Sequence, residues 1–403
     1  MSRAGRFLLA LLLSSALAGC LRQEPDPVIR LTWWITYAAD SEEYPAFEDI
    51  AEAFAEQTGI LVELVPVPWE EIAPRGGAAP PLSRLIESGE GPDLWGPVPH
   101  TWLSPYVSRD QALPLNPRQI RSQNQYDPLA LQASLLKGQQ YALPLLIDSV
   151  ALIYNRSLVP TPPDTFEQLV QIAREHTEPN GDRWGLALPL LSPTHAYPFM
   201  DGYGGYLLGC RIAADAASTD ALPADEPSAA ETPDSDIACD LEDLGLNNAG
   251  SVQGIQLLSD LYVRERLFSQ ALADRSQMHE RAIQLFAGGQ AAMLIDGPWV
   301  LPALRDSAVE YGVAPLPTLP GASKPPRPLT VVHILAANAQ TEHPGQVLEL
   351  MNTIAAPESI ASLSGVLSKP PARRDLVRQS SLEHARAWRD QASQGVLLPP
   401  IPE

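Results

Sequence analysis

One short stretch of the chain places an aromatic side chain where α/β sheets bind ligands. Residues 291–295 have the length and apolarity of a buried strand, and Asp296-Gly297-Pro298 then breaks that strand. Trp299 follows at once, and because Pro is favoured in a first helical turn, it lies where the strand passes into a helix. Open α/β sheets bind ligands at this edge. Trp299 is therefore a candidate ligand-binding residue, and the alternative is a Trp that fills a core.

A cysteine near the N-terminus predicts a lipid anchor. Arg3 and Arg6 form a basic start, residues 7–13 are apolar, and Leu17-Ala18-Gly19-Cys20 resembles the end of a bacterial lipoprotein signal, in which the Cys becomes the lipidated first residue. The apolar run is too short to span a bilayer. We expect a signal peptide over residues 1–19 and lipidation of Cys20, in a protein that works outside the cytoplasm. The alternative is an ordinary signal peptide that happens to carry a Cys.

The other two cysteines predict a disulfide. In an oxidising compartment, pairing Cys210 with Cys239 is the economical interpretation. They flank residues 213–236, which are rich in Ala, Asp, Glu, Ser, Thr and Pro and cannot bury enough apolar surface to fold. We expect the bond to close the base of an acidic disordered insert over residues 210–243. The chain has no CxxC, HxH or HExxH spacing, so no metal site is predicted.

Length and charge narrow the classes of function. The 403 residues suit two or three domains. Removing residues 1–19 deletes two Arg and no acidic residue, so the net charge moves from −21 to −23. Such a surface repels phosphate backbones and anionic headgroups, which disfavours nucleic acid and broad electrostatic membrane binding. Neutral and cationic solutes remain as ligands.

The elements that would position these side chains indicate a parallel sheet. After a linker over residues 20–27, residues 28–36 form a β-rich run, an apolar helical pattern ends at Thr58-Gly59, and residues 60–67 form a second strand. This succession is a right-handed crossover unit of a parallel sheet. The residues alone therefore predict an α/β fold.

Asp148 is a second candidate side chain, because it interrupts one long extended run. Residues 141–147 are extended, and a strand continues through Ile153-Tyr154-Asn155. Beyond this run, Thr165 and Gln168 predict a capping box at the start of a helix.

Eight short segments then identify a family by their order. Behind the lipoprotein signal the chain resembles the extracellular solute-binding proteins of ABC importers, family 1, in the sugar-binding group that includes maltose- and maltodextrin-binding proteins. The resemblance runs from about Val28 to the last residue. The segments are Gln57-Thr58-Gly59-Ile60, Gly89-Glu90-Gly91-Pro92-Asp93, Leu152-Ile153-Tyr154-Asn155-Arg156, Gly204-Gly205-Tyr206, Gly245-Leu246-Asn247-Asn248-Ala249-Gly250, Asp296-Gly297-Pro298-Trp299, Tyr311-Gly312-Val313 and Pro399-Pro400-Ile401-Pro402.

The resemblance implies a two-lobe periplasmic-binding-protein (type II) α/β fold with a hinge between the lobes. Carried onto this chain, the first lobe is residues 28–146 plus 334–367. The second lobe is residues 147–333 plus 368–403. The crossings between the lobes are expected near 146–149 and near 331–334, which agrees with the position of Asp148 in the extended run.

The resemblance also implies ligand contacts. Sugars present apolar faces and many hydroxyls, which flat aromatic rings and charged or amide groups bind. Trp299 falls on a family position that stacks under a sugar ring, and Asp148 falls on an acidic position that accepts hydroxyl hydrogen bonds. The alternative for Asp148 is a cap of the hinge loop.

Further candidates lie in three loops where the chain departs from the family pattern. Trp95, His100 and Trp102 match a region in which the maltose-binding group carries a Trp and then an Asp-Arg pair that clamps hydroxyls, but the pair is absent here. The alternative is a core Trp95 and a surface His100. Thr194 and Tyr197 match another ligand segment, with Ser192 where an acid is common. The first-strand loop adds Tyr37 and Asp40.

The function that the resemblance implies is a monomeric, lipid-anchored binding component of an ABC importer, without cofactor or catalytic activity. It would capture a maltose- or maltodextrin-like di- or oligosaccharide and deliver it to the permease subunits in the membrane. Two alternatives remain open: a binding protein for another small glucoside or osmolyte, and a secreted glycoside hydrolase, which would need two flanking carboxylates. Family members usually continue past the Pro-rich tag into a helix pair with another stacking Trp, whereas the sequence given stops at Pro402-Glu403. Either the second lobe lacks that wall or the sequence is truncated.

Overall fold

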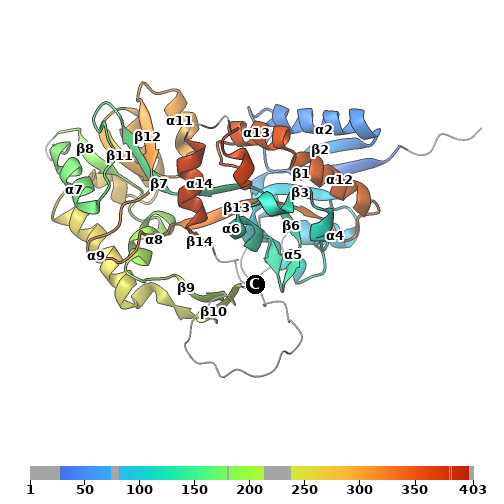
Figure 1. Cartoon of the computed structure of the whole chain (residues 1–403), viewed down its shortest axis with the longest axis horizontal. Coiled ribbons are helices and arrows are strands. Elements are labelled where there is room, and N and C mark those ends of the chain that lie inside the picture. The colour runs from blue at the N-terminus through green and yellow to red at the C-terminus, as the bar shows by residue number, and fades with distance from the viewer. Residues whose placement is uncertain are drawn as a thin grey trace, which may run out of the picture.

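The chain folds into two α/β lobes, each with its own sheet and apolar core (Figure 1). The computed structural model describes residues 28–73, 81–178, 181–212, 237–380, 382 and 384–398. The signal segment, Cys20, the linker and the Pro-rich tag after residue 398 lie outside the described residues. Two lobes with mixed helices and sheets confirm the expected fold class.

The sheet of the first lobe begins with the predicted crossover unit. Strand β1 is parallel to β2 and β3, while β13 is antiparallel to β3 and to β6. Between β1 and β2, helix α2 ends at Gly59, whose φ of 74° forms the left-handed cap that Gly adopts without strain. The strands are β1 (Arg30–Ile35), β2 (Leu61–Pro66), β3 (Leu94–Pro99), β6 (Ala142–Ser149), β13 (Leu329–Ala337) and β14 (Val396–Leu397).

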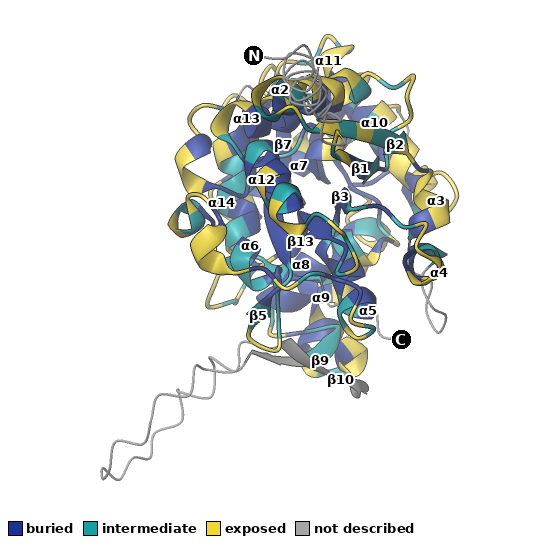
Figure 2. Cartoon of the chain, turned by 90° about the vertical axis from the view of Figure 1, so that its right-hand side faces the viewer, coloured by how far each residue is buried: buried dark blue, intermediate teal, exposed yellow. Residues whose placement is uncertain are grey.

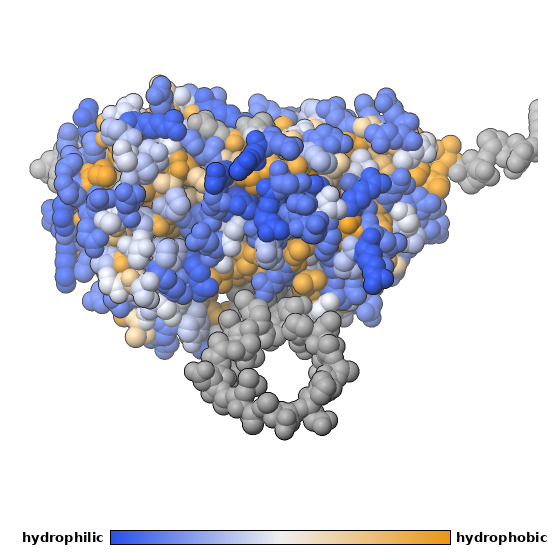
Figure 3. Space-filling model, in the orientation of Figure 1, coloured by the Kyte–Doolittle hydropathy of each residue, from blue (hydrophilic) through white to orange (hydrophobic). Residues whose placement is uncertain are grey.

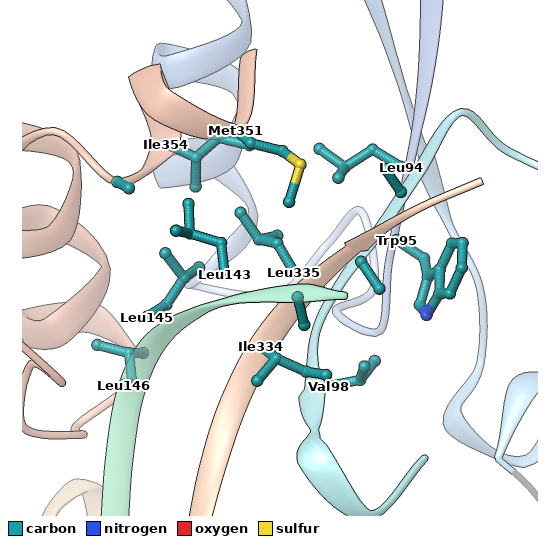
Figure 4. Packing of buried hydrophobic residues seen from close by; sticks show 14 of the residues in the cluster. Leu94, Trp95, Val98, Leu143, Leu145, Leu146, Ile334, Leu335, Met351 and Ile354 are labelled. Carbon is teal, nitrogen blue, oxygen red and sulfur yellow. The ribbon is translucent and has the colours of Figure 1, made fainter. Parts of the chain in front are cut away.

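Helices cover this sheet and bury its apolar residues. Leu143, Leu335 and Met351 from three different elements meet in the core, together with Trp95 from β3 (Figure 4). Seen from the first-lobe side, the strands are buried behind helices whose outer faces are exposed (Figure 2). The helices are α2 (Tyr44–Thr58), α3 (Trp69–Ile72), α4 (Pro81–Ser88), α5 (Leu103–Val107), α6 (Pro128–Gln132), α12 (Pro344–Ile354) and α13 (Pro357–Val366).

The second lobe has a four-stranded sheet in the order β12-β7-β11-β8. Strand β11 is parallel to β8 and antiparallel to β7, which also pairs antiparallel with β12. The predicted Thr165–Gln168 capping box is present at the start of α7. The strands are β7 (Ala151–Asn155), β8 (Trp184–Ala187), β11 (Ala291–Asp296) and β12 (Tyr311–Ala314). The helices are α7 (Phe166–Glu175), α8 (Pro193–Gly202), α9 (Ala249–Val263), α10 (Met278–Ala287), α11 (Leu301–Arg305) and α14 (Ala385–Ser393).

Three chain segments cross between the lobes side by side. Strands β6 and β13 pair antiparallel, with Val331 opposite Asp148 and His333 opposite Leu146. On the other edge of β6, Ile147 N donates to Pro370 O over 2.9 Å and Ala372 N donates to Leu145 O over 2.9 Å. Asp148 lies inside β6, so the expected break at this residue is wrong. The extended run instead breaks at Val150, after the pairing with β13 ends at Ser149.

The third crossing passes gradually from one lobe to the other. Ala372 and Leu376 pack in the first core, whereas Leu382 and Trp388 pack in the second. By packing, this segment joins the second lobe after Leu376 rather than at residue 368 as expected. It returns to the first lobe at Ala392 and Leu397, where β14 pairs with β13.

The expected insert is shorter than predicted, because its flanks form a two-stranded antiparallel sheet. Strands β9 (Leu208–Ile212) and β10 (Ile237–Leu244) pair with Cys210 directly opposite Cys239. Residues 213–236 lie outside the described residues. The backbone register therefore brings the two cysteines together, although their bond stays a prediction.

We predict that the mature protein, isolated from an oxidising compartment, has no free thiol. Directly opposite residues of an antiparallel pair have Cα atoms about 4.5–5.5 Å apart, a separation that a disulfide spans. Titration with a thiol reagent in denaturant should therefore give no reaction before reduction and two thiols per chain afterwards. Two thiols before reduction would contradict the Cys210–Cys239 bond.

The surface is polar and the described part has no membrane span. On the face of Figure 3, hydrophilic side chains predominate and apolar ones are scattered among them, as on ordinary globular proteins. Within the described ranges, no helix is both long enough and apolar enough to cross a bilayer.

Candidate ligand-binding site

The carboxyl edges of both sheets meet at the crossings. In the second lobe Asp296, the last residue of β11, pairs with Ala151 at the point where β6 passes into β7. In the first lobe Pro99, the last residue of β3, pairs with His333 of β13. Loops that follow parallel strands therefore converge on the crossing strands from both sides, which is where α/β sheets bind ligands.

Trp299 lies on the second-lobe side of this region. It is the middle residue of the single helical turn Pro298–Val300 between β11 and α11. Its side chain is 38% exposed, whereas Pro298 and Val300 beside it are buried. A Cβ at Gly297 would collide with the indole, so this position needs Gly. The exposure shows that Trp299 does not fill the core.

A buried histidine fixes the turn that carries Trp299. His195 of α8 is 1% exposed, with Nδ1 2.8 Å from Ser192 Oγ and Nε2 3.0 Å from Asp296 Oδ1. The same carboxylate oxygen accepts from Gly297 N over 2.8 Å. The His195 ring also lies edge-on to Trp299, with the centroids 6.4 Å apart. The start of α8 and the end of β11 are thereby held together under the indole.

Asp148 belongs to a buried cluster with one member from each crossing segment. We call Asp148, His333 and Lys369 the crossing cluster. Lys369 Nζ donates to Asp148 Oδ2 over 2.6 Å, and His333 Nε2 lies 2.9 Å from the same oxygen. Lys369 Nζ also lies 5.9 Å from the centroid of the Trp299 ring, within cation–π range. The cluster therefore connects the crossings to the aromatic side chain of the second lobe.

The electrostatics of the cluster keep Asp148 ionised. Burial alone would raise the pKa of Asp148, but the Lys369 ammonium and the hydrogen bond from His333 together hold it well below its usual range. For His333, burial first and then the Lys369 charge lower the pKa, so the ring is neutral at neutral pH. A neutral ring with its proton on Nε2 can donate to Asp148.

The predicted residues of the first-strand loop and of α8 differ in exposure. Tyr37 stacks on Phe47, and its pKa is raised by burial and then by the carboxylates of Glu43 and Asp148. Asp40 in the same loop is exposed. Thr194 is half-buried in the first turn of α8. Tyr197 is buried one turn further on, and burial is the main cause that raises its pKa to about 12.

The two predicted Trp side chains in β3 and in the turn that follows it are buried and do not face a ligand site. Trp95 is 1% exposed and packs in the first core, with its ring 5.3 Å from that of Tyr106. The core alternative for Trp95 is therefore the one that the structure favours (Figure 4). Trp102 is also buried, beneath the exposed Trp69, and the two ring centroids are 4.3 Å apart.

His100 is a structural residue of the crossings. It is 6% exposed, so the alternative of a surface His100 is wrong. Its Nε2 lies 3.0 Å from Leu398 O, and its Nδ1 accepts from Val332 N over 3.2 Å. Both ring nitrogens are thus occupied by backbone groups, because the chain folds back along β13 here.

An apolar pocket lies elsewhere, in the second lobe. Its lining includes Phe166, Phe199, Ile295 and Leu316 and offers almost no polar surface. A sugar needs hydrogen-bonding partners for its hydroxyls, so we do not assign the ligand to this pocket.

Three residues of the site were not predicted. His333 and Lys369 belong to no motif, and His195 lies between the predicted Thr194 and Tyr197 without a signal of its own. The roles of His333 and Lys369 depend on the β6–β13 register and on the 370–372 pairing, and that of His195 depends on the contact between α8 and the end of β11.

Comparison with known proteins agrees with this geometry. The family model for bacterial extracellular solute-binding proteins matches residues 38–361. A solved cyclo/maltodextrin-binding protein in complex with maltotetraose superposes with a TM-score of 0.73 at 25% identity, covering 94% of this chain and 89% of that one. The Thermus thermophilus maltotriose-binding protein, at 23% identity and a TM-score of 0.66, shows the same fold over 92% of this chain and 89% of its own.

Curated relatives are similar over part of their length. A maltotriose-binding protein of Pyrococcus abyssi is 25% identical over 270 residues, 65% of this chain and 50% of the relative. A maltooligosaccharide ABC transporter solute-binding lipoprotein of Streptococcus pneumoniae is 24% identical over 286 residues, 69% of this chain and 57% of the relative. A galactooligosaccharide-binding protein of Bacillus subtilis is 24% identical, over 78% of this chain and 67% of its own length. The chain thus spans little more than half the length of the first two.

Proposed function

The chain belongs to the bacterial extracellular solute-binding proteins, and from this premise we propose that it captures a neutral di- or oligosaccharide between its lobes for an ABC importer. The observation that carries the proposal is the exposed Trp299, which Lys369 links to the ionised Asp148 at the crossings. An aromatic face and a carboxylate suit the apolar face and the hydroxyls of a sugar. The maltooligosaccharides named for similar proteins support this ligand class.

Ligand would act by shifting a population between open and closed lobes. Trp299 belongs to the second lobe and Tyr37 to the first, so a sugar that touches both gains its full contacts only when the lobes are closed. The closed form is then stabilised by the difference in affinity between the two states. The permease would recognise that form. We propose that the protein acts as a monomer. We also propose that lipidated Cys20 holds it at the extracytoplasmic surface of a membrane, as the lipoprotein relative supports.

The geometry favours binding over hydrolysis. A glycoside hydrolase needs one carboxylic acid with a raised pKa to protonate the leaving group. The pKa of Asp148 is instead held low by Lys369 and His333, although burial opposes this. Asp296, the carboxylate at the end of β11, is fully buried and bound to His195. We therefore propose no enzymatic activity.

We expect maltose, maltotriose or maltotetraose to raise the melting temperature of the purified protein. A ligand at one hundred times its dissociation constant stabilises the native state by about 2.7 kcal/mol, which corresponds to a shift on the order of 3 °C for a chain of this size. A galactooligosaccharide and a small glucoside in the same panel would separate the alternatives. The proposal fails if no sugar shifts the transition, and steady release of reducing ends would indicate a hydrolase.

A further inference from the structure

Lys369 is one of only three lysines in the chain, and it is placed differently from the other two. Lys137 and Lys324 are exposed, whereas the Lys369 side chain is 13% exposed and ends between Asp148 and Trp299. A lysine that gives up most of its hydration at the crossings needs a compensating interaction. Asp148 supplies one such interaction.

The backbone holds Lys369 in a fixed position. Ser364 Oγ donates to Lys369 O over 2.7 Å, and Lys369 N donates to Ser364 O over 3.2 Å at the end of α13. The next residue, Pro370, accepts from Ile147 N of β6, directly before Asp148. Arg305 at the end of α11 also donates to Ser368 Oγ over 2.7 Å. The ammonium group is therefore preorganised by contacts to both lobes.

The bonding of the cluster leaves groups for a ligand. Within the part of the chain that the structure describes, the two hydrogen bonds to the Asp148 carboxylate both end on Oδ2, so Oδ1 can still accept. An ammonium has three N–H donors, and among the described residues Nζ of Lys369 bonds only to Asp148. The remaining donors lie beside the exposed ring of Trp299. One free acceptor and free donors thus lie next to each other at the edge of an aromatic face.

We propose that Lys369 is a ligand-binding residue that acts as a pair with Asp148. The carboxylate would accept a hydrogen bond from one sugar hydroxyl, and the ammonium would donate one to the adjacent hydroxyl. The pair would thus bind a vicinal diol on a sugar ring stacked against Trp299. Because the two charges cancel, the pair selects a neutral sugar over a charged one. It would replace the Asp-Arg clamp that is missing from the loop after β3.

This inference rests on the proposed function, and maltotriose titration separates the two. We expect Lys369→Met to weaken maltotriose binding by about tenfold or more, the loss typical of a hydrogen bond to a charged group, and Lys369→Arg to recover part of it. The matched control is Arg389→Met. Arg389 is 18% exposed in its side chain and pairs with the buried Asp127, so its loss removes the same kind of ion pair between α14 and α6.

Amine labelling of the wild type gives a second measurement that needs no variant. Maltotriose should protect Lys369 from acetylation, read by mass spectrometry, while the exposed Lys137 and Lys324 react equally with and without sugar. This measurement decides the question if Lys369→Met does not fold.

The outcomes are distinct. Loss of affinity in Lys369→Met with normal affinity in Arg389→Met supports the inference, as does selective protection of Lys369. Wild-type binding that persists unchanged in folded Lys369→Met, or labelling of Lys369 that sugar does not alter, overturns it. If the wild type binds no sugar in the panel, the proposed function fails and this inference fails with it.

Discussion

Replacing Trp299 with Ala is expected to weaken maltooligosaccharide binding by about 30- to 1,000-fold. Central aromatic residues of binding sites typically contribute about 2–4 kcal/mol, and each 1.4 kcal/mol is a factor of ten. Trp299 is placed for such a contribution, because its exposed ring lies beside Lys369 and is fixed from below by His195 and Gly297. Calorimetric titration with maltotriose measures the loss.

The same variant should keep its fold. Trp299 is 38% exposed, so truncation also removes buried apolar area, and the melting temperature without sugar should fall by a few degrees while the protein stays folded. The matched control is Trp184→Ala. Trp184 is also partly exposed but starts β8, at the amino edge of the same sheet and away from the crossings. If Trp299→Ala binds maltotriose as tightly as Trp184→Ala does, Trp299 is not a ligand-binding residue.

The α/β elements were predictable because their signals are local, whereas the two-lobe arrangement was implied by the family resemblance. The β-rich run of β1, the end of α2 at Gly59 and the Thr165–Gln168 capping box depend on residues close in sequence, and each is present. The turn that carries Trp299 was predictable for the same reason, since a buried strand followed by Gly-Pro admits few conformations.

The site was predictable only in part, because it depends on pairing between distant segments. Lys369 reaches Asp148 across 221 residues, through a backbone pairing that no local pattern signals. Trp95 was ambiguous for a related reason. A Trp near one end of a strand can belong to the core or to an exposed loop. Trp95 pairs with Trp34 on one side and with Ala336 on the other, so it lies within the sheet.

We further expect stability to fall as the pH is lowered from about 6.5 to 4, with His100 as a main cause. Burial lowers the pKa of His100 from 6.5 to about 4, although the bonds to Leu398 O and Val332 N and the nearby Asp148 oppose this, and His333 adds to it. Because the folded value lies below the unfolded one, the unfolded chain binds more protons in this window. Acidification therefore favours unfolding, and this one group removes up to about 3 kcal/mol by pH 4.

The geometry explains why protonation of His100 is costly, and a variant isolates its effect. Nδ1 accepts from Val332 N, so a proton on Nδ1 would set two donors against each other inside the crossing strands. Urea midpoints at pH 7, 5.5 and 4.5 should fall steeply for the wild type and less for His100→Asn, which has no titrating ring. His333, whose pKa is also lowered by burial, is present in both proteins, so the difference in slope belongs to His100. Parallel pH profiles would show that His100 is protonated in the folded state without cost.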